Sequence, residues 1–229
     1  MPDKKPQDKT GVNKSKIIIV DDHPIVRQGL IGLINHEDDL DVCGQAEDAH
    51  QAMETINALR PDIVIVDISL KKTSGIELIK DIKAAYPNIA VLALSMYDES
   101  LYAERALRAG AKGYVMKREA SEEVTKAIRK ILSGEIYISE RMAARMARKL
   151  VSTRPEVSAS PIDCLSNREL EVFYLIGQGC GTRQISERLG VSVKTVETYR
   201  AHIKEKLNFA NASELLQYAI RWVNSQDKG

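Results

Sequence analysis

The sequence lacks the features that mark disulfide-bonded, metal–sulfur and membrane proteins. Among its 229 residues there are three cysteines, Cys43, Cys164 and Cys180. They are far apart, odd in number and without the CxxC or Cys/His spacing of a metal site, which is typical of free thiols in a reducing compartment. No apolar run approaches the length of about 20 residues that a membrane span needs, and the polar N-terminus MPDKKPQDKTGVNKSK has no signal-peptide segment. We expect a cytoplasmic protein without membrane contact, with a flexible tail over residues 1–15.

An excess of charge of one sign is also missing. The chain has 33 Lys and Arg against 32 Asp and Glu, which gives a net charge of +1. No global basic field marks a nucleic-acid binder, so a local basic face would have to supply that function. The hydrophobic content of 44% and the charged content of 28% are ordinary for a globular protein. The length fits two small domains better than one.

The stretch from Pro61 to Gly75, PDIVIVDISLKKTSG, organises the first half of the chain. Its unbroken apolar, β-branched run, Ile63 to Val66, is typical of a strand buried on both faces of a parallel sheet. The run ends in Asp67, at the end of the strand where open α/β sheets place their ligands. Taken alone, Asp67 could also be only a strand-end or helix-capping residue.

Strand and helix patterns alternate five times in the first half of the chain, which implies a parallel sheet with helices on both faces. The expected strands are 17–20, 40–46, 63–66, 89–94 and 112–116. The expected helices begin at Pro24 and at Ile76 and otherwise cover 49–59, 101–109 and 121–132. Ser121 is expected to cap the last of these helices.

Polar residues follow four of these strands, at the edge where the carboxyl ends of parallel strands meet. They are Asp21, Asp22, Asp67, Ser95 and Lys117. Carboxylates this close together repel one another unless a cation joins them, and oxygen ligands with open positions suit Mg²⁺. An aspartate is a known nucleophile for phosphoryl groups, and a lysine and a hydroxyl can hold phosphoryl oxygens. The cluster therefore indicates phosphoryl transfer to an aspartate.

Residues 16–134 resemble the receiver domain of bacterial two-component response regulators, through the motifs IIIVDDHP, DIVIVDISL, VLALS and KGYVMK. The resemblance implies that Asp67 is phosphorylated and that Ser95 and Lys117 act with it in the phosphoryl chemistry. It also implies a Mg²⁺ site, whose ligands would be the carboxylates of Asp21, Asp22 and Asp67 and the backbone carbonyl of Ser69. Ser95 and Tyr114 would form a switch that turns inward on activation. Without the resemblance, Tyr114 would be read as a half-exposed aromatic at the sheet edge.

One position departs from the receiver pattern. Lys71, followed by Lys72, stands four residues after Asp67, where receivers usually carry proline. We hypothesise that these lysines alter the lifetime of the phosphoryl group or the docking of the kinase.

Residues 135–163 are expected to link two domains. The segment 139–150, SERMAARMARKL, fits a connector helix with a solvated basic face better than an arm that contacts phosphates. Residues 151–163 contain Ser and Pro and little apolar content, which fits a flexible hinge.

Residues 164–229 are expected to form a small helical domain. Ser166 or Asn167 caps its first helix and Ser192 caps a later one, and two short helices around a glycine-containing turn form a helix-turn-helix pattern. The segments LSNRELEVFYLIGQG and RQISERLGVSVKTVETYRAHIKEKL resemble the DNA-binding domain of NarL/LuxR-class (FixJ) regulators. The expected fold class is thus α/β, with a doubly wound five-stranded parallel sheet, the flavodoxin-like receiver, and a second, smaller all-α helix-turn-helix domain.

The same resemblance makes residues 193–207 the recognition helix. Its non-core face, expected to bind DNA, carries Lys194, Thr195, Glu197, Thr198, Arg200, Ala201 and Lys204. Lysine and arginine there suit phosphate contacts, whereas Glu197, Thr198 and Ala201 stand where the family reads base edges.

The charge of the second domain is near balance, so we expect two copies to pair on two half-sites. The family pairs through its last helix. Three apolar residues of that helix could be either core or dimer face: Leu216, Ile220 and Val223.

These features predict a DNA-binding transcriptional response regulator. A sensor histidine kinase would pass phosphate to Asp67 with Mg²⁺, and the active form would bind promoter DNA as a homodimer, with RNA polymerase as a further candidate partner. The protein would catalyse its own phosphoryl transfer and dephosphorylation but is not an enzyme in the usual sense. Two alternatives stay open: a phosphorylation-independent DNA-binding protein with a vestigial receiver, and a Mg²⁺-dependent phosphohydrolase, which typically has a second Asp where Ser69 stands here.

Overall fold

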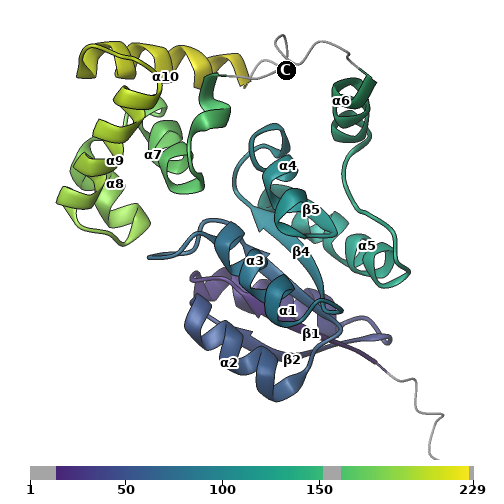
Figure 1. Cartoon of the computed structure of the whole chain (residues 1–229). Coiled ribbons are helices and arrows are strands. Elements are labelled where there is room, and N and C mark those ends of the chain that lie inside the picture. The colour runs from purple at the N-terminus through teal and green to yellow at the C-terminus, as the bar shows by residue number, and fades with distance from the viewer. Residues whose placement is uncertain (1–13, 152–160, 227–229) are drawn as a thin grey trace, which may run out of the picture.

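Five strands alternate with helices along the first part of the chain (Figure 1). The structure is a computed structural model that describes residues 14–151 and 161–226. The strands are β1 (Ser15–Val20), β2 (Leu40–Ala46), β3 (Ile63–Asp67), β4 (Ala90–Ser95) and β5 (Gly113–Met116). They pair in parallel in the order β2-β1-β3-β4-β5. The expected α/β fold with a doubly wound, five-stranded parallel sheet is confirmed.

Helices cover both faces of this sheet and explain its apolar strands. One face is covered by α1 (Pro24–Asn35) and α5 (Ala120–Leu132), and the other by α2 (Ala49–Leu59), α3 (Gly75–Ala85) and α4 (Glu99–Ala109). Ile17 and Ile19 of β1 pack against α1 and α5, whereas Ile18 and Val20 pack on the opposite face. All four side chains are fully buried, which is why the strand is a continuous apolar run rather than an alternating one.

Local capping signals account for the end of α4 but not for the start of α5. Gly110 ends α4 in the left-handed region, with a φ of +108°, where glycine is favoured. Ser121, expected to cap α5, lies instead inside its first turn. A 3₁₀ turn over Lys117–Glu119 leads directly into a helix that begins at Ala120, and the N-cap residue Glu119 makes no side-chain capping bond. The prediction for Ser121 is therefore wrong.

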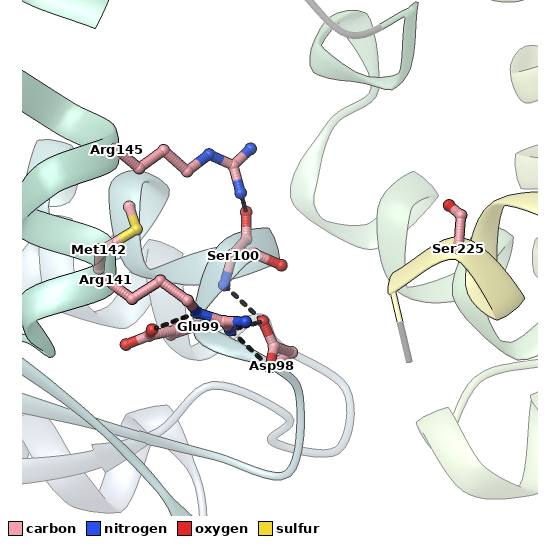
Figure 2. Close-up of a pocket in the computed structure, with 7 residues that line it drawn as sticks. All are labelled: Asp98, Glu99, Ser100, Arg141, Met142, Arg145 and Ser225. Carbon is pink, nitrogen blue, oxygen red and sulfur yellow. Dashed lines mark hydrogen bonds and ion pairs between the residues drawn. The ribbon is translucent and has the colours of Figure 1, made fainter. Parts of the chain in front are cut away.

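Helix α6 (Glu140–Val151) lies beside α4. Figure 2 shows Arg141 and Arg145 reaching from α6 toward the start of α4. The Arg141 guanidinium lies 3.2 Å from Asp98 Oδ1 and 3.4 Å from Glu99 Oε1, and Arg145 donates a hydrogen bond to the Ser100 carbonyl at 3.1 Å. Part of the basic face that we expected to be solvated thus contacts α4.

Residues 161–226 contain helices and no strand. After a short 3₁₀ turn the helices are α7 (Asn167–Gly177), α8 (Thr182–Leu189), α9 (Val193–Lys206) and α10 (Ala212–Gln226). The backbone N–H of Glu169 donates to the Ser166 hydroxyl at 3.3 Å, so Ser166, rather than Asn167, caps α7. Ser192 caps α9 as expected, and Gly190 ends α8 with a φ of +63°. The expected smaller all-α domain is confirmed.

The expected tail and hinge lie mostly outside the described residues, whereas the three cysteines lie within them. Residues 1–13 of the expected tail and residues 152–160 of the expected hinge lie outside the described part of the chain. Within the described ranges, every helix is too short or too polar to cross a membrane. The three cysteines are free thiols, as their spacing predicts.

The helical domain docks on the α3–α4 side of the sheet, mainly through α7. Arg168 of α7 donates a hydrogen bond to the carbonyl of Leu70, just after β3, at 2.8 Å. In the opposite direction, Arg105 of α4 donates to the Leu165 carbonyl, just before α7, at 2.7 Å. These two arginines therefore connect the start of α7 to the α/β domain, one from each domain.

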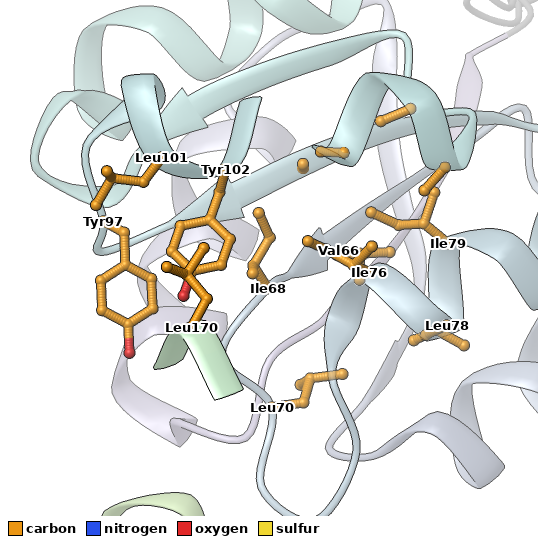
Figure 3. Close-up of a cluster of buried hydrophobic side chains, with 14 of the residues drawn as sticks. Val66, Ile68, Leu70, Ile76, Leu78, Ile79, Tyr97, Leu101, Tyr102 and Leu170 are labelled. Atoms are coloured by element: carbon orange, nitrogen blue, oxygen red, sulfur yellow. The ribbon is translucent and has the colours of Figure 1, made fainter. Parts of the chain in front are cut away.

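Apolar and aromatic side chains fill the space between the two domains. Figure 3 shows Leu170 of α7 beside Tyr97 and Tyr102 of the α/β domain, and Leu170 is 1% exposed. Tyr97 stacks on Tyr102, with ring centroids 4.9 Å apart, and meets Tyr174 of α7 edge-on at the same centroid distance. Tyr97 is therefore the aromatic link between the sheet edge and the helical domain.

Candidate functional site

The polar strand-end residues meet at the carboxyl edge of the sheet, as the topology predicts. Asp21 follows β1, Asp67 ends β3 and Ser95 ends β4, and all three are fully buried. Lys117 follows β5 and reaches into this cluster, where its Nζ lies 2.6 Å from Asp21 Oδ2 and 2.8 Å from Asp67 Oδ2. Asp22, next to Asp21, has a side chain that is 7% exposed. We call Asp21, Asp22, Asp67 and Lys117 the acid pocket.

Burial and mutual repulsion set the electrostatics of the acid pocket. Burial raises the pKa of Asp67 although Lys117 opposes the shift, and the Asp21 carboxylate raises it further. Burial alone would lower the pKa of Lys117, but the Asp67 and Asp21 carboxylates outweigh it, so that pKa is raised. Three carboxyl groups face a single buried ammonium. A further cation would therefore stabilise the pocket.

The oxygens of the acid pocket fit a hard metal ion. Both carboxylate oxygens of Asp22 are buried and accept no hydrogen bond from the described residues. Possible ligand atoms of Asp21, Asp22, His23 and Asp67 lie within 4.8 Å of one another. Carboxylate oxygens with open positions are what Mg²⁺ requires, so the residues present fit the expected ion.

His23 belongs to this cluster, although the sequence analysis did not identify it as a site residue. Its Nδ1 lies 3.1 Å from Asp21 Oδ1 and 3.1 Å from Asp22 Oδ1. Imidazole suits transition metals better than Mg²⁺. We therefore interpret His23 as a hydrogen-bond partner that orients the Asp21 carboxylate and lies close to that of Asp22. The three consecutive residues Asp21, Asp22 and His23 are the sequence pattern from which its place in the cluster could have been predicted.

The Asp67 carboxylate is oriented at both of its oxygens. The Ser69 N–H donates to Oδ1 at 3.0 Å, and Lys117 Nζ donates to Oδ2 at 2.8 Å. The backbone carbonyl of Ser69, which we expect to be a metal ligand, belongs to the same short segment directly after β3. A carboxylate fixed in this way presents a defined face to an incoming group, which is what a nucleophile needs.

Ser95 and Tyr114 connect the acid pocket to α4. Ser95 Oγ accepts a hydrogen bond from the Tyr97 N–H at 3.0 Å, and the Tyr114 hydroxyl donates to the Tyr97 carbonyl at 2.8 Å. Tyr114 is 4% exposed, so it is not a half-exposed aromatic at the sheet edge. It already lies inward. Both expected switch residues thus hold the backbone of Tyr97, whose ring contacts the helical domain.

Lys71 also reaches the acid pocket, a contact that the sequence did not predict. Its Nζ forms an ion pair with Asp22 Oδ2 at 3.2 Å. The next residue, Lys72, donates its backbone N–H to the carbonyl of Leu189, the last residue of α8, at 3.1 Å. Lys71, which stands where receivers usually carry proline, and its neighbour Lys72 therefore face two different partners.

The expected DNA-binding residues lie along the outer side of α9. Lys194, Glu197, Thr198 and Ala201 are exposed. Three others are partly buried: Thr195, Arg200 and Lys204. The hydroxyl of Thr195 lies 2.8 Å from that of Ser192, which ties it to the helix cap. Among the described residues, the side-chain hydrogen bonds of this outer side stay within α9 and its cap, and none reaches the α/β domain.

The three apolar residues of α10 that we left undecided separate into two groups. Val223 is 6% exposed and packs at Gly177, where an added Cβ would lie 2.4 Å from a Val223 methyl carbon. Leu216 and Ile220 are 40% and 37% exposed. Val223 thus serves the core of the helical domain, and the exposed apolar face of α10 consists of Leu216 and Ile220.

Comparisons with known proteins agree with both halves of this architecture. Residues 17–129 match the family model of the response regulator receiver domain, and residues 163–219 match that of bacterial regulatory proteins of the luxR family. The chain is 37% identical over 211 residues to the oxygen regulatory protein NreC of Staphylococcus epidermidis, which covers 90% of this chain and 97% of that protein.

Solved structures give the same picture. A two-component response regulator of the LuxR family from Aurantimonas sp. SI85-9A1 aligns with a TM-score of 0.56 and 35% identity, over 61% of this chain and all of that one. RcsB from Salmonella enterica serovar Typhimurium, solved on the rprA promoter with the phosphomimetic BeF₃⁻, aligns with a TM-score of 0.59 and 27% identity, over 90% of this chain and 98% of that one.

Proposed function

The chain belongs to the two-component response regulators that join a receiver domain to a LuxR-type DNA-binding domain, and from this premise we propose that a sensor histidine kinase phosphorylates Asp67 and so controls binding to promoter DNA. It is a DNA-binding regulator and not a conventional enzyme. We assign the receiver to residues 16–134 and the DNA-binding domain to residues 164–229. Its site of action is the cytoplasm, where such a kinase would present its phosphoryl group.

The observation that carries the proposal is the position of Asp67. It is fully buried, and Lys117 and the Ser69 N–H hold its two oxygens. In the transfer, an Asp67 oxygen forms a bond to phosphorus while the bond from phosphorus to the donor's nitrogen breaks. The Lys117 ammonium is placed to meet a phosphoryl oxygen as charge develops there, and the Ser95 hydroxyl can donate to another.

Mg²⁺ is the ion that the acid pocket would bind, through the carboxylates of Asp21, Asp22 and Asp67 and the carbonyl of Ser69. When bound, it neutralises charge on the phosphoryl oxygens. The buried Asp22 oxygens without a hydrogen-bond donor support this assignment. His23 and Lys117 would keep the carboxylates oriented around it.

The switch acts through Tyr97. Ser95 gives up its bond to the Tyr97 N–H when it turns to the phosphoryl group, and this frees the backbone that the Tyr114 hydroxyl also holds. Because Tyr114 is already inward, the rearrangement involves Ser95 and Tyr97. The Tyr97 ring packs on Tyr174 of α7, so its movement weakens the docking of the DNA-binding domain and shifts the population toward an active form.

The released domain binds promoter DNA through α9, as a homodimer. Lys194, Arg200 and Lys204 contact phosphates, and Glu197, Thr198 and Ala201 meet base edges. The exposed Leu216 and Ile220 of α10 supply an apolar face for pairing. RNA polymerase is a further candidate partner at the promoter.

The proposal is tested by treating the full chain with acetyl phosphate and Mg²⁺ and measuring its intact mass beside Asp67→Ala. We expect a single phosphoryl adduct on the wild type and none on the variant. An adduct of equal yield on Asp67→Ala would refute Asp67 as the acceptor, and steady release of inorganic phosphate from small phosphoesters would favour a phosphohydrolase.

A further inference from the structure

The loop between β3 and α3, residues 68–74, brings a positive charge to the metal-binding side of the acid pocket. Lys71 Nζ lies 3.2 Å from Asp22 Oδ2, and the Lys71 side chain is 51% exposed while that of Asp22 is 7% exposed. The Asp22 oxygens accept no hydrogen bond from the described residues. The positive charge of Lys71 therefore compensates the negative charge of Asp22. Lys117 does the same for Asp21 and Asp67.

The same loop is held by the DNA-binding domain. Three consecutive residues are involved: the Leu70 carbonyl accepts from Arg168 at 2.8 Å, the Lys72 N–H donates to Leu189 at 3.1 Å, and the Lys71 stem packs at Gly190. A Cβ added to Gly190 would lie 3.1 Å from the Lys71 Cβ. Docking thus fixes the backbone on both sides of Lys71.

The backbone of this loop is itself unusual. Lys72 has a φ of +67°, in the left-handed region that residues other than glycine rarely adopt. Such a conformation persists when its surroundings hold it, and here the bond from its N–H to Leu189 of the other domain does so. The loop conformation that points Lys71 at Asp22 therefore depends on the docked domain.

We propose that Lys71 is a tethered cation that competes with Mg²⁺ for Asp22, and that the docked DNA-binding domain holds it in that position. The inference rests on the proposed metal site, of which Asp22 is a ligand. A metal ion at Asp22 and the Lys71 ammonium repel each other, so the ion displaces the lysine. Displacement moves the loop that the DNA-binding domain contacts. By thermodynamic reciprocity, metal binding weakens docking, and docking weakens metal binding by the same factor.

The first arm of the test measures Mg²⁺ affinity of the full chain by isothermal titration calorimetry at fixed ionic strength, for the wild type, Lys71→Met and Lys72→Met. Lys72→Met is the matched control, because it removes the same charge from the same loop. A half-exposed ion pair is worth at most about 1 kcal/mol, so we expect Lys71→Met to bind Mg²⁺ about three- to fivefold more tightly. Lys72→Met stays within about twofold of the wild type.

A failure of the role of Lys71 and a failure of the metal site give different results. Mg²⁺ binding of equal affinity in the wild type and Lys71→Met would overturn the role of Lys71 and leave the metal site intact. An equal gain in Lys71→Met and Lys72→Met would overturn it too, because general charge would then be the cause. Absence of Mg²⁺ binding in every protein, with Mn²⁺ binding also absent by electron paramagnetic resonance, would overturn the metal site itself and the inference with it.

The second arm tests the link to docking. Arg105→Ala removes the bond to Leu165 and loosens docking, and among its described contacts Arg105 touches neither the acid pocket nor the loop. We expect Arg105→Ala to tighten Mg²⁺ binding when Lys71 is present and to leave it unchanged in the Lys71→Met background. Equal effects in the two backgrounds would overturn the claim that docking holds Lys71 at Asp22.

Discussion

Arg168 donates a hydrogen bond to the carbonyl of Leu70 at 2.8 Å, so the DNA-binding domain holds the backbone three residues after Asp67. The same guanidinium also donates a hydrogen bond to Glu171, one turn further along α7. The Glu171 side chain is fully buried at the domain interface. Burial of a carboxylate is costly unless its charge is compensated. Docking therefore places an acidic group of one domain where it interacts electrostatically with Asp67 of the other.

Docking should weaken as the pH rises. Burial raises the pKa of Glu171 from 4.5 to about 7, with Arg168 opposing the shift and Asp67 adding to it. Between pH 4.5 and about pH 7, Glu171 keeps its proton in the docked state but has lost it in the separated domains. The neutral carboxyl therefore favours docking fully below about pH 4.5, and this stabilisation of the docked state is lost as the pH rises through about 7. Small-angle X-ray scattering of the unphosphorylated chain from about pH 5.5 to about pH 8 should show expansion.

Glu171→Gln should remove that pH dependence, because its amide keeps the size of the side chain and carries no charge. The exposed Glu187 of α8 offers the matched control, Glu187→Gln. A wild type whose scattering is the same across the range, or an undiminished pH response in Glu171→Gln, would contradict the assignment.

Lys117→Met should destabilise the receiver at neutral pH. The Lys117 side chain is 7% exposed and pairs with two buried carboxylates, and removing one partner of a buried pair typically costs about 3–5 kcal/mol. Urea unfolding without metal should show a loss of this size. Addition of Mg²⁺ should restore part of it, since an ion at the proposed site would also compensate Asp21 and Asp67. Unchanged stability would mean that the two carboxylates are not charged in the folded protein.

Substitutions on α9 should divide by chemistry. Arg200→Ala and Lys204→Ala remove proposed phosphate contacts, so each should weaken binding to all DNA sequences alike and reduce the salt dependence by about one counterion. Glu197→Ala should instead change which sequences are selected, at a cost of about 1–3 kcal/mol for the original site. Fluorescence anisotropy over a salt series measures both effects. A uniform loss for Glu197→Ala would argue against base contact.

The two kinds of apolar residue on α10 should respond differently to truncation. Val223→Ala leaves a cavity at Gly177 and should lower the unfolding free energy by about 1–3 kcal/mol. Leu216→Ala together with Ile220→Ala should change stability little, because both side chains are over a third exposed, but should weaken pairing on DNA. Analytical ultracentrifugation with a two-half-site duplex measures pairing. Wild-type pairing by the double variant would place the dimer face elsewhere.

Much of the fold could be predicted because it depends on short-range patterns. The run from Ile63 to Val66 predicts a central strand, since only a strand covered on both faces needs four consecutive apolar residues. The position of each polar residue at a strand end then places Asp21, Asp67 and Lys117 at one edge, because parallel strands end together.

The contacts that could not be predicted depend on residues far apart in the chain. Nothing near Lys71 indicates that its ammonium would meet Asp22, and nothing near Glu171 indicates that a second domain would bury it. Local signals also fail where a neighbouring turn competes. Ser121 has the composition of a cap, but the 3₁₀ turn after Lys117 starts the helix earlier. Helical periodicity puts Val223 on an apolar face without saying which partner covers it.

The central claim is that phosphorylation of Asp67 controls DNA binding. The most direct test is the affinity of the full chain for a duplex obtained by in vitro selection, measured by fluorescence anisotropy with and without acetyl phosphate and Mg²⁺, for the wild type and Asp67→Ala. The account predicts that phosphorylation tightens binding of the wild type by about 5- to 150-fold, the usual range of allosteric coupling, and leaves Asp67→Ala unchanged. Equal affinity of the treated and untreated wild type would contradict it and make the receiver vestigial.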